Sequence, residues 1–294
     1  MSRQRAAEAA LVLNTVFWGA TFVLVKAALG SVSPVLFLAL RFSLATLALA
    51  VVFRRARPTR GAALKAIGVG ALTGTFLFLG YLLQTVGLRF TTAPKSAFIT
   101  GLLSVMVPLL AALVYRNRPQ VSEVAGVLVA TAGLGLMTFE SAIGPIGRGD
   151  LLTLFCAVAF AAHIVTLGHF SESMSYEWLS VAQVGAAAAW SLALFWWVET
   201  PQVLWRPAVL WAILITGLLC TALAFTTQAW AQQYTTSTRT ALIYMLEPLF
   251  AWLTSFVFVG EGLSARAAAG AALILGGVVL VELKPLNAWQ HPSK

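Results

Sequence analysis

The sequence predicts an all-α membrane protein with ten transmembrane helices, arranged as two inverted five-helix repeats. Three observations support this fold class. The composition is 60% hydrophobic and only 10% charged, with a mean hydropathy of +0.87. Ten apolar runs are long enough to cross a bilayer. The second half of the chain repeats part of the first half at a constant shift, as from Lys95 to Arg239.

The composition excludes several classes of function. Soluble proteins carry roughly 25% charged residues, far more than this chain of 294 residues does. Ten spans of about 20 residues use most of the chain and leave no loop that could hold a domain. A tethered soluble enzyme, a DNA-binding module and a secreted disulfide scaffold are therefore excluded. The net charge of +9 is spread over short connections, so we expect no nucleic-acid partner.

The first five predicted spans are residues 8–30, 34–53, 64–88, 95–115 and 121–140. Each is a continuous apolar run, which favours a helix because a backbone in hydrocarbon must satisfy its own hydrogen bonds. The first run is too long for a signal-peptide core and precedes no cleavage pattern, so we expect it in the mature protein. The other four begin at or after a proline, where a missing backbone donor costs little: Pro34, Pro58, Pro94 and Pro119.

The second five predicted spans are residues 150–169, 178–198, 208–231, 238–259 and 264–283. Prolines again fall between or beside them: Pro145, Pro201, Pro207 and Pro285. The two cysteines, Cys156 and Cys220, lie inside these apolar runs and are expected to be small core side chains. We therefore expect no disulfide, no metal site and no cofactor.

The distribution of basic residues predicts the orientation. With a cytoplasmic N-terminus, the cytoplasmic connections and tails hold twelve Lys and Arg residues and the outer ones hold five. The other two of the 19 basic residues, Lys26 and Arg41, lie inside spans. This bias predicts a multi-pass protein of the inner membrane with both termini in the cytoplasm.

The internal repeat relates the third to fifth spans to the eighth to tenth. At a shift of 144 residues, four positions illustrate the match: Lys95 with Arg239, Ala97 with Ala241, Gly126 with Gly270, and Gly133 with Gly277. The first two spans match the sixth and seventh more faintly, at a shift of about 143. Because each copy holds an odd number of helices, the second copy enters the membrane the other way round. We predict two domains, residues 1–145 and 146–294, that face each other around a central site.

The stretch 239–282 resembles the second repeat of EamA-type proteins of the drug/metabolite transporter superfamily. The shared features are Leu246-Glu247-Pro248, the Gly260-Glu261 turn, and the glycines Gly270, Gly276 and Gly277; residues 17–22 and Arg41-Phe42 also look like the family's first two helices. The resemblance covers essentially the whole chain and implies a ten-helix transporter. Within the superfamily the chain is most similar to the aromatic amino-acid exporters of the YddG type. The first repeat departs from the pattern, because Leu103-Ser104 stands where the second has Glu247-Pro248.

Ionisable residues inside spans are the first candidates for function, because burying one costs about 2.5 to 3.5 kcal/mol. Glu247 lies in the ninth span with Tyr244 one turn before it, so both face one way. Such a carboxylate can bind a substrate ammonium or a coupling proton; alternatively, Glu247 and Pro248 shape a helix break. His163 lies in the middle of the sixth span as a second candidate, or is a packed histidine bonded to a carbonyl or threonine.

The resemblance further implies which helices line the cavity, and helical spacing then selects the side chains. These form an aromatic, weakly polar wall that suits an aromatic or amphipathic small molecule. The predicted substrate-binding residues are Asn14, Trp18, Tyr81, Phe98, His163, Thr227, Tyr244 and Glu247. Gln228 is the alternative to Thr227.

Two basic residues lie inside spans but outside the predicted substrate-binding set. Lys26 lies about one turn from the end of its span and can snorkel to the interface or hold a substrate carboxylate. Arg41 is expected to be a structural anchor on an outer helix.

The predicted function is export of a small amphipathic metabolite, an amino acid and preferably an aromatic one, by alternating access around a central cavity. No phosphate loop, paired acidic motif or nucleophile elbow is present in the sequence, so we predict a secondary transporter rather than an ATP-driven pump or an enzyme. The alternatives are a multidrug or quaternary-ammonium efflux protein, an intramembrane enzyme using His163 and Glu247, and a scaffold without transport. The expected partners are the substrate and the lipid bilayer, and one chain can function as a monomer.

Overall fold

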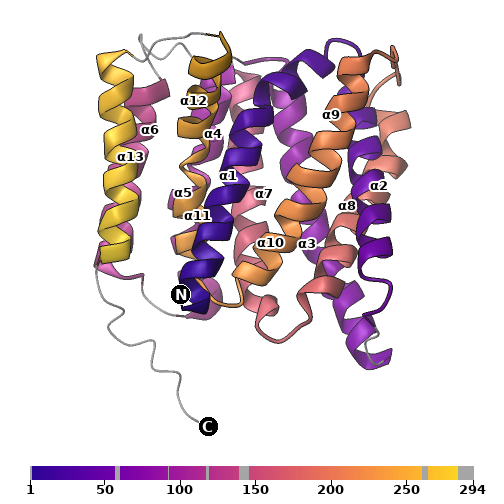
Figure 1. Ribbon diagram of the computed structural model, residues 1–294, viewed down its shortest axis with the longest axis horizontal. Helices are drawn as coiled ribbons and strands as arrows, with labels where there is room; N and C mark the ends of the chain where they lie inside the picture. Colours follow the sequence, from indigo (N-terminus) through magenta and orange to yellow (C-terminus); the bar gives the residue numbers. More distant parts are fainter. Residues whose placement is uncertain are drawn as a thin grey trace.

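The computed structural model describes residues 2–56, 60–91, 93–116, 119–138, 146–259 and 264–283. Within these ranges the regular structure is helical, apart from one bridge that joins Val32 to Val203. The helices stand side by side as a bundle, with their ends gathered at two opposite faces (Figure 1). We call the face that holds the start of α1 the N-terminal end, and the opposite face the far end.

Within the described residues the helices make ten crossings of the bundle, as predicted. The first half contains α1 (Arg3–Ala28), α2 (Pro34–Val52), α3 (Arg60–Gly87), α4 (Ala93–Gly101) with α5 (Leu103–Tyr115), and α6 (Val121–Thr138). The second half contains α7 (Arg148–Ser171), α8 (Tyr176–Val198), α9 (Pro207–Gly217) with the π-helix η1 (Leu218–Leu223) and α10 (Ala224–Ala231), α11 (Ser237–Tyr244) with α12 (Glu247–Val259), and α13 (Ala265–Leu283).

The bundle is built to face lipid. Seven helical segments of the described chain are long and apolar enough to cross a membrane. Large apolar side chains on the outside of the bundle remain exposed, among them Leu113 at 76%, Val51 at 65% and Trp197 at 86%. Exposed apolar side chains on this scale indicate a hydrocarbon surrounding rather than water. The predicted fold class, an all-α membrane protein of ten crossings, is confirmed.

Three of the ten spans are interrupted in the structure, and the interruption at Glu247-Pro248 is the helix break that the sequence offered as one reading of that pair. The span 238–259 breaks after Tyr244, because Pro248 has no N–H to donate to the Tyr244 carbonyl and its ring clashes with that carbonyl. The span 95–115 breaks at Leu102, the position equivalent to Leu246 in the second half. The span 208–231 contains the π-helix. Hydropathy finds a crossing but does not report the hydrogen-bond pattern within it.

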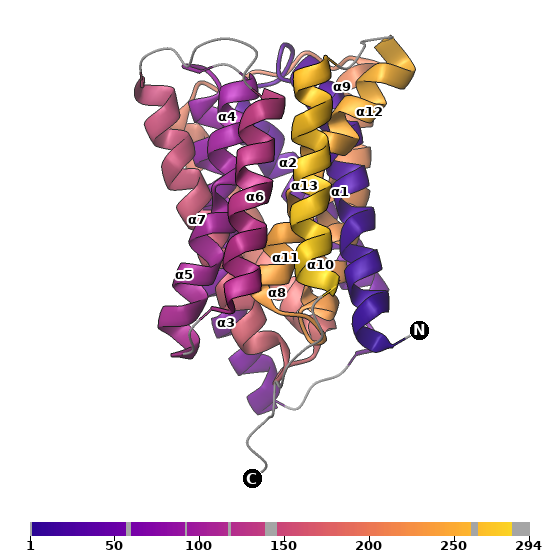
Figure 2. The same ribbon diagram turned by 90° about the vertical axis from the view of Figure 1, so that its left-hand side faces the viewer.

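The contact between α6 and α13 shows the inverted symmetry of the two halves. These two helices form the most extensive helix pair in the described chain and lie side by side in both views (Figures 1 and 2). A β-carbon at Gly126 would meet the Gly277 carbonyl oxygen at 2.8 Å, and one at Gly133 would meet the Gly270 oxygen at 2.5 Å. The repeat relates Gly126 to Gly270 and Gly133 to Gly277, so each contact is the image of the other, as a two-fold axis requires.

Two ion pairs obey the same symmetry, one at each end of the bundle. At the far end, Lys95 Nζ lies 2.6 Å from Asp150 Oδ2, and the Thr91 hydroxyl donates to Asp150 Oδ1 at 2.6 Å. At the N-terminal end, Glu8 provides the carboxylate of the equivalent ion pair.

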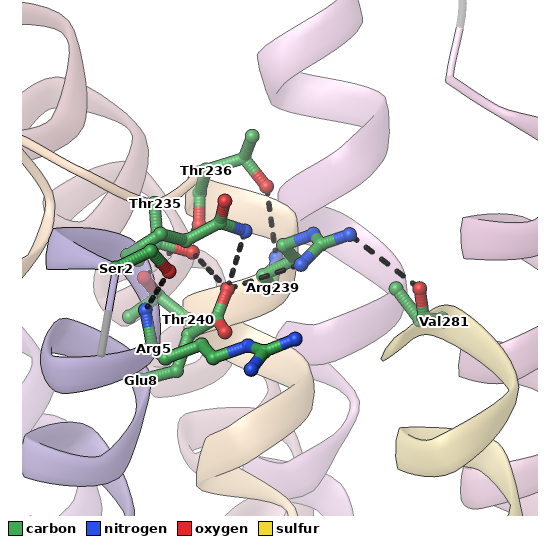
Figure 3. Close-up of polar contacts among 9 residues, drawn as sticks. Ser2, Arg5, Glu8, Thr235, Thr236, Arg239, Thr240 and Val281 are labelled. Carbon is green, nitrogen blue, oxygen red and sulfur yellow. Dashed lines mark hydrogen bonds and ion pairs between the residues drawn. The ribbon is translucent and has the colours of Figure 1, made fainter. Parts of the chain in front are cut away.

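There, Arg239 Nη1 lies 3.0 Å from Glu8 Oε1, and the Thr235 hydroxyl donates to the same oxygen at 3.1 Å (Figure 3). Each pair joins the first crossing of one half to the fourth crossing of the other. Glu8 and Asp150 are 142 residues apart, so the structure refines the shift of about 143 that the sequence indicates for the first crossings.

Candidate substrate site

Aromatic rings from five helical segments meet in the middle of the bundle. Trp18 on α1 lies against Tyr244 on α11 and Phe225 on α10, with ring centroids 4.8 and 5.9 Å apart. Tyr81 on α3 lies against Phe160 on α7 at 5.2 Å and reaches Phe225 at 6.3 Å. Tyr81 and Phe225 are 144 residues apart, and Trp18 and Phe160 are 142 apart, so the two halves contribute equivalent rings. We call these five rings the central aromatic cluster.

The π-helix η1 places a backbone carbonyl beside this cluster. The oxygen of Cys220 accepts a hydrogen bond from Trp18 Nε1 at 2.9 Å and another from Arg41 Nη2 at 3.2 Å. Within the segment, the Thr221 hydroxyl donates to the Thr216 carbonyl five residues back at 2.8 Å. Short π-helical turns often occur at functional sites, because the altered hydrogen-bond pattern frees backbone groups for other partners.

Arg41 points into the bundle, contrary to the expectation of an outer anchor. The residue is 5% exposed, because α2 packs against η1 and thereby buries the guanidinium. Nε donates to the Thr221 hydroxyl at 2.6 Å, and Nη2 donates to the Tyr81 hydroxyl at 3.2 Å. The guanidinium carbon also lies 4.7 Å from the centre of the Tyr81 ring. These contacts hold a positive charge at the edge of the central aromatic cluster.

Glu247 is the first residue of α12, directly after the break that follows α11. Its carboxylate makes no hydrogen bond and no ion pair with the residues that the structure describes, and it is half-buried. The backbone of α1 lies close to Glu247: a β-carbon at Gly19 would be only 2.8 Å from the Glu247 carbonyl oxygen. Glu247 is also within electrostatic range of Tyr81 and Tyr244. An unpaired carboxylate inside a membrane protein is a candidate for ligand binding.

Two further predicted residues border the cluster with their polar groups already engaged. The buried Asn14 donates from Nδ2 to the Ala224 carbonyl at 2.9 Å. The buried His163 forms a hydrogen bond of 2.9 Å between Nε2 and Gln183 Oε1, and its ring lies 5.7 Å from Phe225. This is the packed alternative for His163, with a glutamine as its partner. The Tyr244 hydroxyl is also buried, and the Asn14 side chain lies near it without a hydrogen bond of normal geometry.

Two more predicted residues lie on α4 and α10. Phe98 on α4 packs toward α6, where a β-carbon at Gly135 would meet its ring at 3.4 Å. Thr227 on α10 is half-buried and makes no hydrogen bond to the described chain, while its alternative, Gln228, donates to Gln232 at 3.1 Å. The side chain of Lys26 lies outside the described residues.

A pocket of about 900 Å³ opens at the far end of the bundle. Its lining includes Val25, Ser31, Thr85, Arg89, Glu199 and Gln202, from the ends of several helices. Thr85 lies one turn beyond Tyr81 on α3, and its hydroxyl donates to the Tyr81 carbonyl at 2.6 Å. The pocket therefore reaches to within one helical turn of the central aromatic cluster.

Sequence reasoning missed four components of this region: the inward position of Arg41, the rings of Phe160 and Phe225, and the carbonyl of Cys220. Phe225 had a signal, because it is the repeat partner of Tyr81. The Cys220 carbonyl had none, since its availability depends on a π-helical turn that the apolar sequence does not reveal.

Ten crossings in two inverted halves, surrounding a buried site with aromatic rings and charged side chains, define a multi-pass membrane transporter. The EamA-like transporter family matches residues 5–139 and, a second time, residues 147–283. The chain is 36% identical over 278 residues to an uncharacterized transporter of Archaeoglobus fulgidus, with 95% of this chain and 86% of that protein covered. This protein belongs to the EamA-like transporter family.

Two other comparisons bear on the fold and on function. A protein of Streptantibioticus cattleyicolor named "Probable terminal-alkyne amino-acid exporter" is 25% identical over 292 residues, covering 97% of this chain and 96% of that one. A crystal structure superimposes with a TM-score of 0.80 at 21% identity, over 95% of this chain and 98% of the other, which shows the shared fold.

Proposed function

We propose that this transporter exports small amphipathic metabolites, with aromatic amino acids preferred, as the exporters of the YddG type do. The observation that carries the proposal is the central aromatic cluster with the unpaired carboxylate of Glu247 beside it. Rings bind rings through stacked and edge-to-face contacts, and a carboxylate orients an ammonium group. The relative named as an amino-acid exporter supports the same substrate class.

Alternating access between residues 1–145 and residues 146–294 is the proposed mechanism. The pocket at the far end approaches the cluster, while polar contacts join the helices at the N-terminal end, including Glu8 with Arg239 and the Tyr115 hydroxyl with the Val165 carbonyl at 3.2 Å. This arrangement supports a state that opens only to the far side. Rocking the two halves against each other would close the far end and open the N-terminal end.

The excess of basic residues at the N-terminal side supports a location in the inner membrane with both termini in the cytoplasm. The far end then faces outward. A single chain holds both halves of the site, so a monomer is sufficient for transport, with the lipid bilayer and the substrate as its partners.

The rival of a quaternary-ammonium efflux protein fits the site less well. Such a cation would gain from the aromatic faces and from Glu247. It would also meet the Arg41 guanidinium, which lies 4.7 Å from the centre of the Tyr81 ring and repels a positive charge.

Uptake and release of radiolabelled compounds by purified protein in liposomes test this function. The compounds are an aromatic amino acid, an aliphatic amino acid and a quaternary ammonium ion, each with and without an imposed pH gradient. Preferential movement of the aromatic amino acid is the expected result. Movement of the quaternary ammonium ion alone would replace the proposal with drug efflux, and no movement of any compound would overturn it.

A further inference from the structure

The central aromatic cluster is nearly symmetric, but the charges beside it are not. The residue equivalent to Arg41, at the shift of 142 that relates Glu8 to Asp150, is Gln183, and the residue equivalent to Glu247 is Leu103. A fold that builds equivalent rings from both halves therefore carries one positive and one negative side chain, each without a charged twin. Fold symmetry does not require these two charges.

Neither charge is neutralised by the described chain. Arg41 forms no ion pair with a carboxylate of the described chain, and its Nη1 makes no hydrogen bond there. Glu247 has no hydrogen bond or ion pair there either. A charge inside a membrane protein without an oppositely charged partner is costly, and it persists only where something compensates the cost.

The two charges lie near the same aromatic rings. Arg41 Nη2 and Trp18 Nε1 both donate to the Cys220 oxygen, so the guanidinium is a neighbour of the indole. The same indole contacts Tyr244, which is one turn before Glu247, and the adjacent Gly19 touches the Glu247 backbone. Tyr81 and Cys220 are each within electrostatic range of both charges.

We infer that Arg41 and Glu247 are the two poles of a zwitterion site, in which Arg41 binds the carboxylate of an amino acid and Glu247 binds its ammonium group. The proposed function gives the class of the cargo, and this inference rests on it while adding how the site recognises that class. An arginine presents several N–H donors to a carboxylate in a fixed geometry, and a carboxylate accepts from an ammonium. One positive and one negative side chain together match the two opposite charges of a zwitterionic substrate, which has no net charge.

Three indole compounds separate the two poles experimentally: tryptophan, tryptamine, which lacks the carboxylate, and indole-3-propionate, which lacks the ammonium. Inhibition constants against labelled tryptophan are measured in liposomes for the wild type and for Arg41→Gln, which installs the side chain of position 183, and Glu247→Gln. The exposed residues Arg266 and Glu172, changed to Gln, supply control variants of the same charge change. Melting in detergent with and without each compound checks folding and binding independently.

The wild type is expected to bind tryptophan about tenfold or more tightly than either single-charge compound. Arg41→Gln should weaken the binding of tryptophan about tenfold and leave the binding of tryptamine unchanged or improved. Glu247→Gln should likewise weaken the binding of tryptophan about tenfold and leave that of indole-3-propionate unchanged or improved. If Arg41→Gln does not fold, Arg41→Lys replaces it and should weaken tryptophan more than tryptamine. Where a variant no longer moves labelled tryptophan, the melting shifts supply the same comparison.

Three outcomes overturn the inference. Equal weakening of all three compounds in both variants would mean that the residues only shape the site. Equal binding of all three compounds by the wild type, with no effect of either variant, would leave the transport function standing without a zwitterion site. If the wild type moves none of the compounds and none raises its melting temperature, the proposed function fails together with this inference.

Discussion

Glu247 begins α12 at the break in the ninth crossing, and its carboxylate has no polar partner in the described chain. Removing its charge therefore costs no hydrogen bond. We expect Glu247→Gln to cut transport of the preferred amino acid about tenfold or more while the melting temperature of the solubilised protein stays equal or rises. Transport in liposomes and thermal unfolding of the same preparation provide the two readouts. Normal transport by the variant would remove Glu247 from the mechanism.

Individual site residues were predictable from sequence to different degrees. Glu247 and Tyr244 were found because an ionisable group in an apolar run is conspicuous and helical spacing places the two on one face. Trp18 and Tyr81 followed from helical spacing within the helices that the resemblance selects. Arg41 was misplaced, because nothing in its own helix reveals that η1 packs against it and turns it inward.

The α6–α13 contact is the element on which the symmetry of the fold depends most visibly. A β-carbon at Gly277 would come within 2.5 Å of the Gly126 carbonyl oxygen, whereas one at Gly276 would have no neighbour within 4 Å. Gly277→Ala should therefore destabilise the protein by about 1 to 3 kcal/mol, because a backbone oxygen cannot move aside easily. Gly276→Ala is the matched control and should be neutral or slightly stabilising. Equal melting temperatures of the two variants in detergent would contradict this packing.

The Glu8–Arg239 pair is expected to stabilise closure at the N-terminal end. Glu8→Gln removes the carboxylate that pairs with Arg239 at 3.0 Å, and loss of one partner of a buried pair costs about 3 to 5 kcal/mol. Its loss should favour opening at the N-terminal end. The equivalent Lys95–Asp150 pair is intact here although the pocket opens at the far end, so Asp150→Asn is the matched control.

The native Cys220 can report such opening. It lies beside the site and is only 1% exposed in this state, so opening should raise the reactivity of its thiol. In Glu8→Gln, a small impermeant thiol reagent applied from the N-terminal side should modify Cys220 about tenfold faster or more. In Asp150→Asn, the rate of modification from the N-terminal side should not rise. Mass spectrometry distinguishes Cys220 from Cys156. An unchanged rate in Glu8→Gln would show that the Glu8–Arg239 pair does not hold the N-terminal end closed.

The elements themselves could largely be predicted from the sequence, and so could the break at Glu247-Pro248, whereas the other two interruptions could not. Continuous apolarity locates a crossing, but the break at Leu102 has no proline at the place that Pro248 occupies in the second half. The basic residues of the two ion pairs could be predicted to be equivalent, since the repeat aligns Lys95 with Arg239. Their acids were not, because a shift of 143 for the first crossings misses Glu8 and Asp150 by one residue.

The orientation of the whole molecule follows from the charge bias and is open to a direct test. Ser2 at the N-terminal end and Gln202 at the far end are both exposed. A cysteine at Gln202 should react with an impermeant maleimide on intact cells, while a cysteine at Ser2 should react only after the membrane is permeabilised. The buried native cysteines give a low background. The reverse pattern would place the termini outside and invert the direction of transport.

The whole molecule is proposed to carry its substrate by alternating exposure of one central site, and counterflow tests this most directly. Liposomes loaded with unlabelled aromatic amino acid are diluted into a trace of the labelled compound. A carrier of this kind accumulates label transiently, because internal substrate accelerates the return of the site. Trp18→Ala, which removes one wall of the cluster, should abolish the effect. Label that merely equilibrates at a rate independent of internal substrate, or does not enter at all, would contradict alternating access around this site.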